Sequence, residues 1–281
     1  MRFGFKTSPQ NTSWSAMLDL WRAADEIEIF ESGWTSDHLY VQHGADPAGG
    51  RLEGWIVLTA LAQATRRLRL GTLVTGIPYR HPGILAAMAA TLDIVSGGRL
   101  ELGIGAGWDE EEAGAHGLAL GSPRVRSDRF EEACQVLISL LSPDQPTTDF
   151  HGTYYDLTNA RCDATPIQRP HPPVVIGGNG EKRTLRTVAR YAQHWNFEGP
   201  GPAAFSHSRD VLYRHCAAEK RDPAEITLSV QVRHTGDAVE TAANAAAFGA
   251  AGADLAIIYL PPPYDESMLA PLAAALSDVA H

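Results

Sequence analysis

The stretch Val174-Val175-Ile176-Gly177-Gly178-Asn179-Gly180 contains the unit from which the whole chain is built. Its three β-branched residues predict a short strand, and the glycines predict a turn. A segment with apolar residues at helical spacing follows. The strand is apolar at every position, which is typical of parallel strands covered on both faces. Leu255-Ala256-Ile257-Ile258 repeats this pattern near the end of the chain.

Seven further strand candidates alternate with segments of helical periodicity. Strands separated by single helices pair in parallel, because a parallel neighbour requires a crossover. Eight such units in about 250 residues are typical of a TIM barrel. We therefore expect an α/β fold, a (β/α)8 TIM barrel with insertions after strand 4 and before strand 5; an open, doubly wound sheet is the alternative. The eight predicted strands are Arg2–Lys6, Phe30–Ser36, Leu68–Gly76, Leu100–Gly105, Val174–Gly177, His194–Glu198, Ile226–Arg233 and Leu255–Leu260.

The two insertions are stretches that break this alternation. Asp109–Arg126 carries an acidic run and scattered glycines. Ser142–Pro173 is rich in proline and includes the strand-prone Thr153-Tyr154-Tyr155, which indicates a hairpin. Neither resembles an interdomain linker, so residues 1–281 are expected to form a single domain.

Composition limits the partners of the chain. Its 281 residues include 23 Lys and Arg against 33 Asp and Glu, a net charge of −10. This balance argues against nucleic acid and acidic membranes as partners. The three cysteines, Cys134, Cys162 and Cys216, form no CxxC pair, so we expect no cysteine-based metal site and no disulfide framework. With no long apolar run and no signal-like N-terminus, a cytoplasmic protein is expected.

In a TIM barrel, the active site lies at the carboxyl ends of the strands. The turn Gly177–Gly180 therefore offers backbone N–H groups at a helix N-terminus, where a phosphate can bind. Lys182 and Arg183 fall in the predicted first helical turn, where cations oppose the helix dipole unless an anion is near. The alternative is a glycine turn required only for close packing.

Two other strand ends carry candidate site residues. Gly103-Ile104-Gly105-Ala106-Gly107 precedes the acidic run Asp109–Glu112, which argues against a dinucleotide fingerprint and for the approach of a flat cofactor, or for a tight barrel corner. Asp37-His38 is a candidate acid–base pair, although a structural histidine is the alternative. Tyr79-Arg80-His81-Pro82 could position an anion or simply begin a helix at Pro82.

The order of several motifs extends this interpretation. The chain resembles the bacterial-luciferase-like superfamily, and within it the coenzyme F420-dependent oxidoreductases. The most specific stretch runs from Leu92-Asp93-Ile94-Val95-Ser96-Gly97-Gly98-Arg99-Leu100 into Gly103–Trp108. The remaining motifs are Trp34–Leu39, Leu70–Gly76, Tyr79–Pro82, Pro166–Pro170, Ile176–Gly180 and Ala192–Asn196.

The resemblance implies a flavin or deazaflavin at the strand ends, with F420 as the expected cofactor and FMN as the alternative. It places the cofactor phosphate on Gly177, Gly178, Asn179 and Gly180. It also implies a non-prolyl cis peptide within Thr72–Thr75, expected at Leu73-Val74. The cofactor-binding residues it implies are Leu73, Val74, Thr75, Gly105, Gly107, Gly177, Gly178, Asn179 and Gly180.

The resemblance places His38 near the redox carbon of the ring as proton donor or hydrogen-bond partner, with Asp37 orienting it. Sugar-phosphate dehydrogenases of this branch have a glutamate where this chain has Trp108, which argues against such a substrate. The expected substrate pocket is formed by Trp108, Glu110 and Phe197, with Glu111 as another acid and His43 nearby. No metal is expected.

The predicted function is hydride transfer between F420 and a small organic substrate. An FMN-dependent monooxygenase is the first alternative, and a non-catalytic flavin-binding barrel is the second. A phosphosugar isomerase or aldolase is a weaker alternative, because the strand ends offer no metal-binding cluster. Lys6 is the only lysine that lies squarely near a strand end. A homodimer is expected from the family. Arg80, Lys182 and Arg183 are the expected source of local positive charge for an anionic cofactor.

Overall fold

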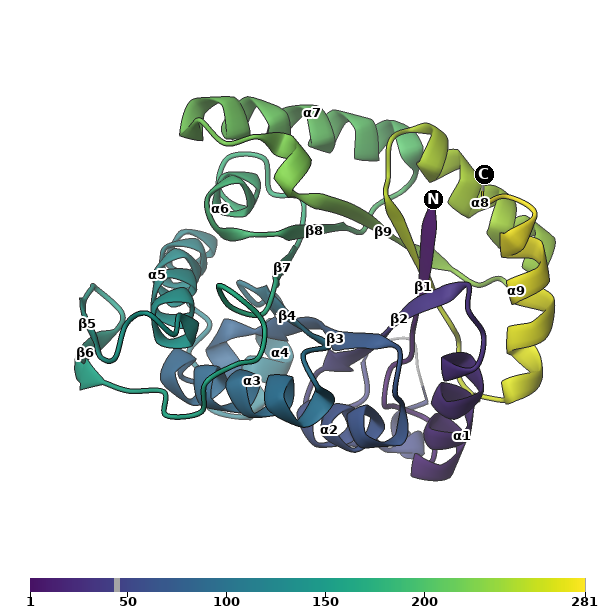
Figure 1. Cartoon of the computed structure of the whole chain (residues 1–281), viewed down its shortest axis with the longest axis horizontal. Coiled ribbons are helices and arrows are strands. Elements are labelled where there is room, and N and C mark those ends of the chain that lie inside the picture. Colours follow the sequence, from purple (N-terminus) through teal and green to yellow (C-terminus); the bar gives the residue numbers. More distant parts are fainter. Residues whose placement is uncertain (43–45, 281) are drawn as a thin grey trace.

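The computed structural model describes residues 1–42 and 46–280, and eight of its strands close into a parallel barrel. Around the barrel, the order is β1, β10, β9, β8, β7, β4, β3 and β2. Figure 1, which looks down the barrel, shows the helices as an outer ring. The barrel strands are β1 (Arg2–Lys6), β2 (Phe30–Asp37), β3 (Arg69–Gly76), β4 (Leu100–Gly105), β7 (Val174–Gly177), β8 (His194–Phe197), β9 (Thr227–Arg233) and β10 (Leu255–Tyr259).

The predicted TIM barrel is confirmed, and closure of the sheet excludes the open, doubly wound alternative. Each barrel strand begins and ends within one residue of its predicted range. The long helices are α1 (Trp14–Asp25), α2 (Gly54–Ala64), α3 (Pro82–Ser96), α5 (Pro123–Leu141), α6 (Thr184–Tyr191), α7 (Pro202–Glu219), α8 (Ala238–Ala250) and α9 (Leu269–Ser277).

Alternate residues of the strands divide the hydrophobic core into two layers. Val174 and Ile176 of β7 pack in the large cluster shared with the helices, whereas Val175 belongs to a small cluster with Trp34 and Ile257. This division follows from the two-residue period of a strand. It explains why the strands are apolar at every position.

A polar ladder crosses the barrel near the amino ends of its strands. His194, the first residue of β8, pairs through Nδ1 with Glu101 Oε2 at 2.8 Å and through Nε2 with Ser229 Oγ at 2.6 Å. Burial raises the pKa of Glu101, but bonding to His194 and Arg69 outweighs it and brings that pKa to about 2. These contacts between β4, β8 and β9 satisfy the buried polar groups.

The predicted insertions contain their own elements. The first holds the short helix α4 (Glu110–Ala115) and the start of α5. The second forms an antiparallel hairpin of β5 (Thr148–His151) and β6 (Asp156–Ala160). The strand-prone Thr153-Tyr154-Tyr155 lies in its turn, where Glu132 accepts hydrogen bonds from all three backbone N–H groups.

The chain returns from the hairpin to β7 through a clamp on α3. The carboxylate of Asp93, fully buried, accepts hydrogen bonds from the backbone N–H groups of Ile167 and Gln168 and from Gln168 Nε2. Gln168 Nε2 also donates to Leu100 O. Two of the motifs that carried the family resemblance are therefore joined by these contacts.

Candidate active site

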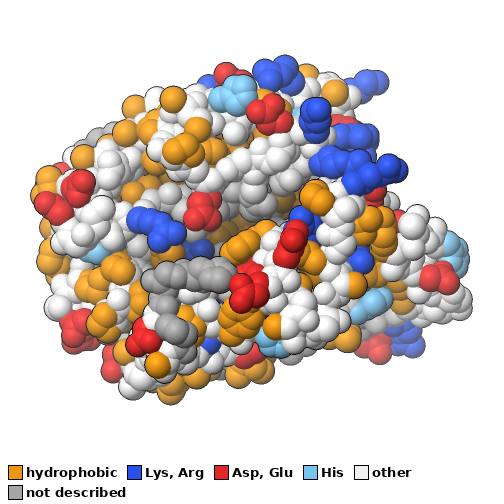
Figure 2. Space-filling model, turned by 180° about the vertical axis from the view of Figure 1, so that it is seen from behind, with side chains coloured by type: hydrophobic (Ala, Val, Ile, Leu, Met, Phe, Trp, Pro, Cys, Tyr) orange, Lys and Arg blue, Asp and Glu red, His pale blue; other side chains and the backbone are white. Residues whose placement is uncertain are grey.

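A cavity of about 1030 Å³ opens at the carboxyl ends of the barrel strands. Figure 2 shows the molecule from behind, hollowed near the middle of the face, with basic, acidic and apolar side chains around the hollow. Of the predicted site residues, nine line the cavity: Asp37, His38, Leu73, Val74, Gly105, Gly107, Trp108, Gly177 and Gly178.

One wall of the cavity is the end of β3. The peptide bond between Leu73 and Val74 is cis, as the resemblance implied. Val74 lies against glycines of the next two strands: a Cβ placed on Gly105 would come within 2.8 Å of Val74 Cγ2, and one on Gly177 within 3.2 Å of Val74 Cγ1. The side chain of Val74 therefore leaves no room for a Cβ on Gly105 unless it shifts, and only a tight fit for one on Gly177. Thr75 points elsewhere and accepts a hydrogen bond from Trp55 of α2.

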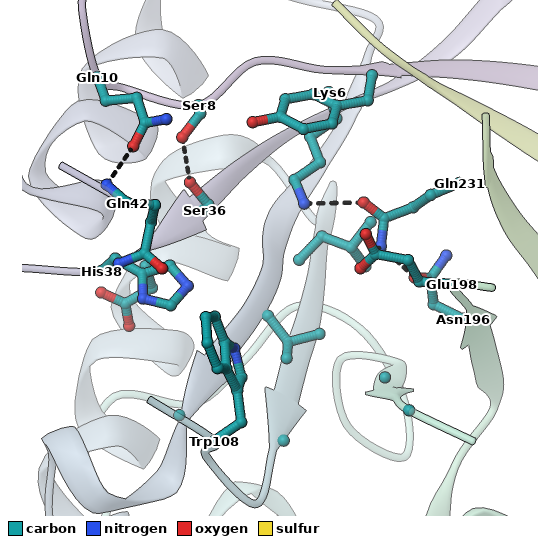
Figure 3. A pocket seen from close by; sticks show the side chains of 18 of the residues that line it. Lys6, Ser8, Gln10, Ser36, His38, Gln42, Trp108, Asn196, Glu198 and Gln231 are labelled. Carbon is teal, nitrogen blue, oxygen red and sulfur yellow. Dashed lines mark hydrogen bonds between the residues drawn. The ribbon is translucent and has the colours of Figure 1, made fainter. Parts of the chain in front are cut away.

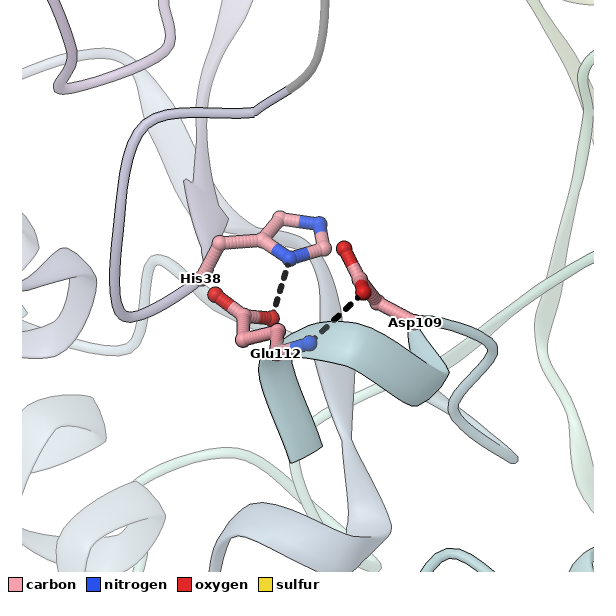
Figure 4. Close-up of side chains that lie close together, drawn as sticks. All are labelled: His38, Asp109 and Glu112. Carbon is pink, nitrogen blue, oxygen red and sulfur yellow. Dashed lines mark hydrogen bonds and ion pairs between the residues drawn. The ribbon is translucent and has the colours of Figure 1, made fainter. Parts of the chain in front are cut away.

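His38, directly after β2, is held by a buried carboxylate (Figure 4). Its Nδ1 lies 2.7 Å from Glu112 Oε2, which also accepts a hydrogen bond from the hydroxyl of Tyr79. Glu112 Oε1 accepts from the backbone N–H groups of Leu39 at 2.5 Å and Tyr40 at 3.2 Å. The side chain of Glu112 is fully buried, so all four acceptor directions of this carboxylate are used within the protein.

These contacts set the protonation of the pair. Burial raises the pKa of Glu112, but the hydrogen bonds from Tyr79 and His38 outweigh it and leave that pKa below its usual value. Burial lowers the pKa of His38, and Glu112 only partly opposes this. Glu112 is therefore ionised, and the neutral imidazole donates from Nδ1–H and keeps a lone pair on Nε2.

The prediction that Asp37 orients His38 is wrong. The carboxylate of Asp37 is held by Arg80, at 2.5 Å from Nη1 and 3.1 Å from Nη2. Arg80 also binds Glu53 at 2.5 Å. The orienting carboxylate is Glu112, whereas Asp37 ties the end of β2 to the segment after β3. Arg80, a predicted source of positive charge for a cofactor, is thus bound by two carboxylates and does not line the cavity.

The glycine turn after β7 lines the cavity in part. Gly177, Gly178 and Thr184 contribute to the wall, while Asn179 and Gly180 do not. No side chain caps α6, but the backbone N–H groups of Gly178 and Leu185 already donate, to Asn196 O at 3.2 Å and to Gly180 O at 3.0 Å. Because α6 begins at Thr184, Lys182 and Arg183 precede its first turn instead of lying in it.

The structure brings one of the three predicted substrate-pocket residues to the cavity. Trp108 stands at the rim, 63% exposed, with its ring centroid 5.6 Å from that of His38. Phe197 is instead buried outside the barrel against Trp195 and Phe205. Glu110 is outside the lining, largely exposed, and pairs with Arg126 at 3.6 Å. His43 lies outside the described residues.

His38, Asp109 and Glu112 place ligand atoms within 4.8 Å of one another, a spacing that a metal ion could use. Asp109 caps α4 by accepting from Glu112 N, and its other oxygen is buried without a partner among the described residues. Glu112, however, already accepts four hydrogen bonds. A cation would have to displace at least one of them, so the cluster is explained by the positioning of His38.

The fold and cavity define a parallel-barrel protein with a large cavity at its strand ends, and comparison with known proteins specifies the family. A model of the luciferase-like monooxygenase family matches residues 1–275. An F420-dependent glucose-6-phosphate dehydrogenase from Microbacterium testaceum is 31% identical over 245 residues, covering 84% of this chain and 69% of that protein. The chain belongs to the luciferase-like monooxygenase family and is an oxidoreductase.

A more distant sequence relative and two solved structures with the same fold extend the comparison. A 4-hydroxyprotoasukamycin monooxygenase from Streptomyces nodosus subsp. asukaensis is 28% identical over 237 residues, covering 76% of this chain and 60% of the relative. A solved F420-dependent secondary alcohol dehydrogenase superposes with a TM-score of 0.86 at 19% identity, over 99% of this chain and 98% of that one. Monooxygenase RslO1 from Streptomyces bottropensis superposes with 0.78 at 20% identity, with both chains fully covered.

Within the described part of the chain, no helix has both the length and the apolar character needed to cross a bilayer.

Proposed function

We propose that the chain is an F420-dependent oxidoreductase that transfers a hydride between the deazaflavin and a small organic substrate. The observation that carries this proposal is His38, fixed by Glu112 in the same cavity as the Leu73–Val74 wall. The 31% identical relative named as F420-dependent supports the choice of cofactor.

The residues fit a flat ring with a phosphate-bearing tail. The cavity exceeds the upper end of the usual ligand-pocket range, about 1000 Å³, so a ring and a small substrate fit together. Leu73 and Val74 would support the ring, because Gly105 and Gly177 add no side chain beside them. The remaining backbone N–H groups of the turn after Gly178, together with Thr184 at the start of α6, would bind the phosphate, because those of Gly178 and Leu185 already donate within the protein.

When bound, the deazaflavin supplies the two-electron hydride carrier, and the protein contributes placement and proton handling. His38 Nε2 would take the proton from a substrate hydroxyl during oxidation, or return it during reduction. Glu112 holds the Nδ1–H tautomer and thereby keeps Nε2 available. Trp108 would form an aromatic wall beside the substrate.

The test of the cofactor is a binding titration of the purified chain with F420 and with FMN, each followed by its fluorescence. We expect saturable F420 binding at least about tenfold tighter than that of FMN. Gly178→Ala is expected to weaken both, whereas Gly114→Ala, on α4 with nothing within 4 Å of the added Cβ, is the matched control. Tight FMN binding without F420 binding would exclude F420 as the cofactor.

An FMN-dependent monooxygenase is the second candidate, since a 28% identical relative is named as a monooxygenase. A barrel that only stores flavin is the third. His38→Ala separates storage from catalysis: an oxidoreductase retains cofactor binding and loses reduction or oxidation of the bound cofactor by substrate. Equal rates in His38→Ala and the unmodified protein would remove His38 from the mechanism.

A further inference from the structure

Lys6, the last residue of β1, is a lysine buried within the cavity, only 8% exposed. Figure 3 shows its side chain reaching across the cavity from the side opposite Trp108. Its Nζ donates to Gln231 Oε1 at 2.8 Å and lies 4.9 Å from the ring centroid of Tyr259. No part of the proposed mechanism requires a cation at this position.

The partner of Lys6 is a neutral amide whose orientation is fixed. Gln231 Nε2 donates to Asn196 Oδ1 at 3.0 Å and to Glu198 Oε2 at 3.3 Å, which leaves Gln231 Oε1 as the end that faces Lys6. An ammonium group has three N–H donors. Among the described residues, Gln231 is the one hydrogen-bond acceptor of this group, and no carboxylate lies within 4 Å of Nζ.

The surroundings compensate the charge of Lys6 only in part. Glu198 is the acid that attracts it, while Arg233 and Arg51 repel it. Glu198 is itself shared with Arg233, at 3.9 Å. Burial lowers the pKa of Lys6 to about 8, so the side chain is mostly charged at neutral pH. A buried ammonium with free donors is costly unless a ligand brings an opposite charge.

We propose that Lys6 binds an anionic oxygen of the substrate, so that the enzyme acts on small carboxylate-bearing molecules. Lys6 is the last residue of β1 and His38 directly follows β2, the adjacent strand. Both residues line the same cavity. A carboxylate on Lys6 would thus orient a substrate whose reacting carbon faces His38. This inference rests on the proposed function for the identity of the cavity as the substrate site, and the same anionic chemistry could come from the cofactor.

The experiment compares carboxylates with their neutral amides. Benzoate against benzamide, and acetate against acetamide, are titrated by calorimetry into the chain with no cofactor added. We expect each carboxylate to bind at least about tenfold more tightly than its amide. Lys6→Met and Lys6→Gln are expected to abolish this preference. Lys220→Met is the matched control, because Lys220 is exposed at the end of α7, does not line the cavity and should leave the preference unchanged.

The preference should also depend on pH. Lys6 loses its proton as pH rises through about 8, so carboxylate binding weakens across that range and amide binding does not. Glu198, Arg233, Arg51, His38 and His234 also face the cavity or Lys6. If Lys6 is the origin, carboxylate binding by Lys6→Met no longer changes with pH near pH 8. If the change with pH persists in this variant, it comes from one of these other groups, and the proposal is overturned.

Three further results would overturn the proposal: equal binding of carboxylates and amides, a preference that survives in both Lys6 variants, and a loss of F420 or FMN affinity in Lys6→Met as large as the loss for benzoate. The last result assigns Lys6 to the cofactor. Thermal melting shows whether each variant is folded. Because the probes are titrated without cofactor, failure of F420 to bind would contradict the proposed function and leave this measurement intact.

Discussion

Glu112→Gln tests the contact that positions His38. The new amide would keep one oxygen for the backbone N–H groups of Leu39 and Tyr40, and would present its NH2 group to His38 Nδ1–H and the Tyr79 hydroxyl. The Nδ1–H of His38 and one amide N–H would then face each other as two unsatisfied donors, whereas the Tyr79 hydroxyl can turn and accept from the other amide N–H. At about 1–3 kcal/mol for each unsatisfied group, the expected loss of unfolding free energy is about 2–6 kcal/mol.

For a chain of this size, each kcal/mol corresponds to about 2 °C, so the melting temperature should fall by about 4–12 °C. His38 can reduce the cost by changing tautomer, accepting at Nδ1 and carrying the proton on Nε2. The nitrogen chemical shifts of His38 in a ¹⁵N NMR spectrum measure this change directly. We therefore expect both a lower melting temperature and Nε2–H in place of Nδ1–H.

Glu110→Gln is the matched control, two residues earlier on the same helix. Glu110 is largely exposed and pairs with Arg126 at only 3.6 Å, so its replacement should change stability by less than about 0.5 kcal/mol. Because Glu112 has a lowered pKa, its stabilisation is complete above its unfolded value of 4.5 and is lost as pH falls through the folded value. Equal melting temperatures for the two variants at neutral pH would refute the role assigned to Glu112.

Three other substitutions have outcomes that the structure predicts. Gly103→Ala would place a Cβ 1.7 Å from Thr72 O on β3, so we expect a loss of about 4 kcal/mol or more, seen as a low soluble yield and an early melt; a normal melt would contradict the strand spacing. Lys6→Met should raise the free energy of unfolding at pH 7 by up to about 3 kcal/mol, because burial lowers the pKa of Lys6 in the folded state and its charge is costly there. The unmodified protein binds fewer protons when folded than when unfolded, so it should gain stability between pH 8 and 10.5, and the variant should not. Gly178→Ala forces alanine to φ +113°, so phosphate-bearing FMN should bind about tenfold more weakly while riboflavin is little affected; equal effects on both would exclude a phosphate role for this turn.

The barrel could be predicted because its strands are marked by continuous apolar runs, which depend on local sequence. The error at Phe197 was avoidable from the same pattern. Along β8, His194 and Asn196 both contact Ser229 inside the barrel, so Trp195 and Phe197 must face the helices. Once Asn196 is assigned to the interior, the two-residue period of the strand excludes Phe197 from the cavity.

The role of Glu112 in holding His38 was not predicted, because Glu112 stands in a run of acidic residues. The run Asp109-Glu110-Glu111-Glu112 has the composition of a solvated helix start, yet Asp109 caps the helix and Glu112, three positions on, is turned toward the barrel. The D-x-x-E spacing was the available signal, since it begins a helix at Asp109 and assigns Glu112 to its first turn. That Glu112 faces His38 depends on packing between segments 74 residues apart, which no local pattern carries.

The same limit applies to charge. Arg80 and Arg183 look available in the sequence, but Arg80 binds Asp37 and Glu53, and Arg183 binds Asp128 of α5. These two arginines are thus already paired with carboxylates, and counting cations near a predicted phosphate turn overestimates the charge there. If a phosphate binds after β7, the backbone N–H groups of the turn and of α6 must provide most of the attraction. Lys6, buried and with no carboxylate within 4 Å of Nζ among the described residues, lies on the far side of the barrel from that turn. The electrostatic asymmetry of the cavity therefore favours a ligand with two separate anionic groups, or two ligands with one each, which is the arrangement that a cofactor and a carboxylate substrate would supply.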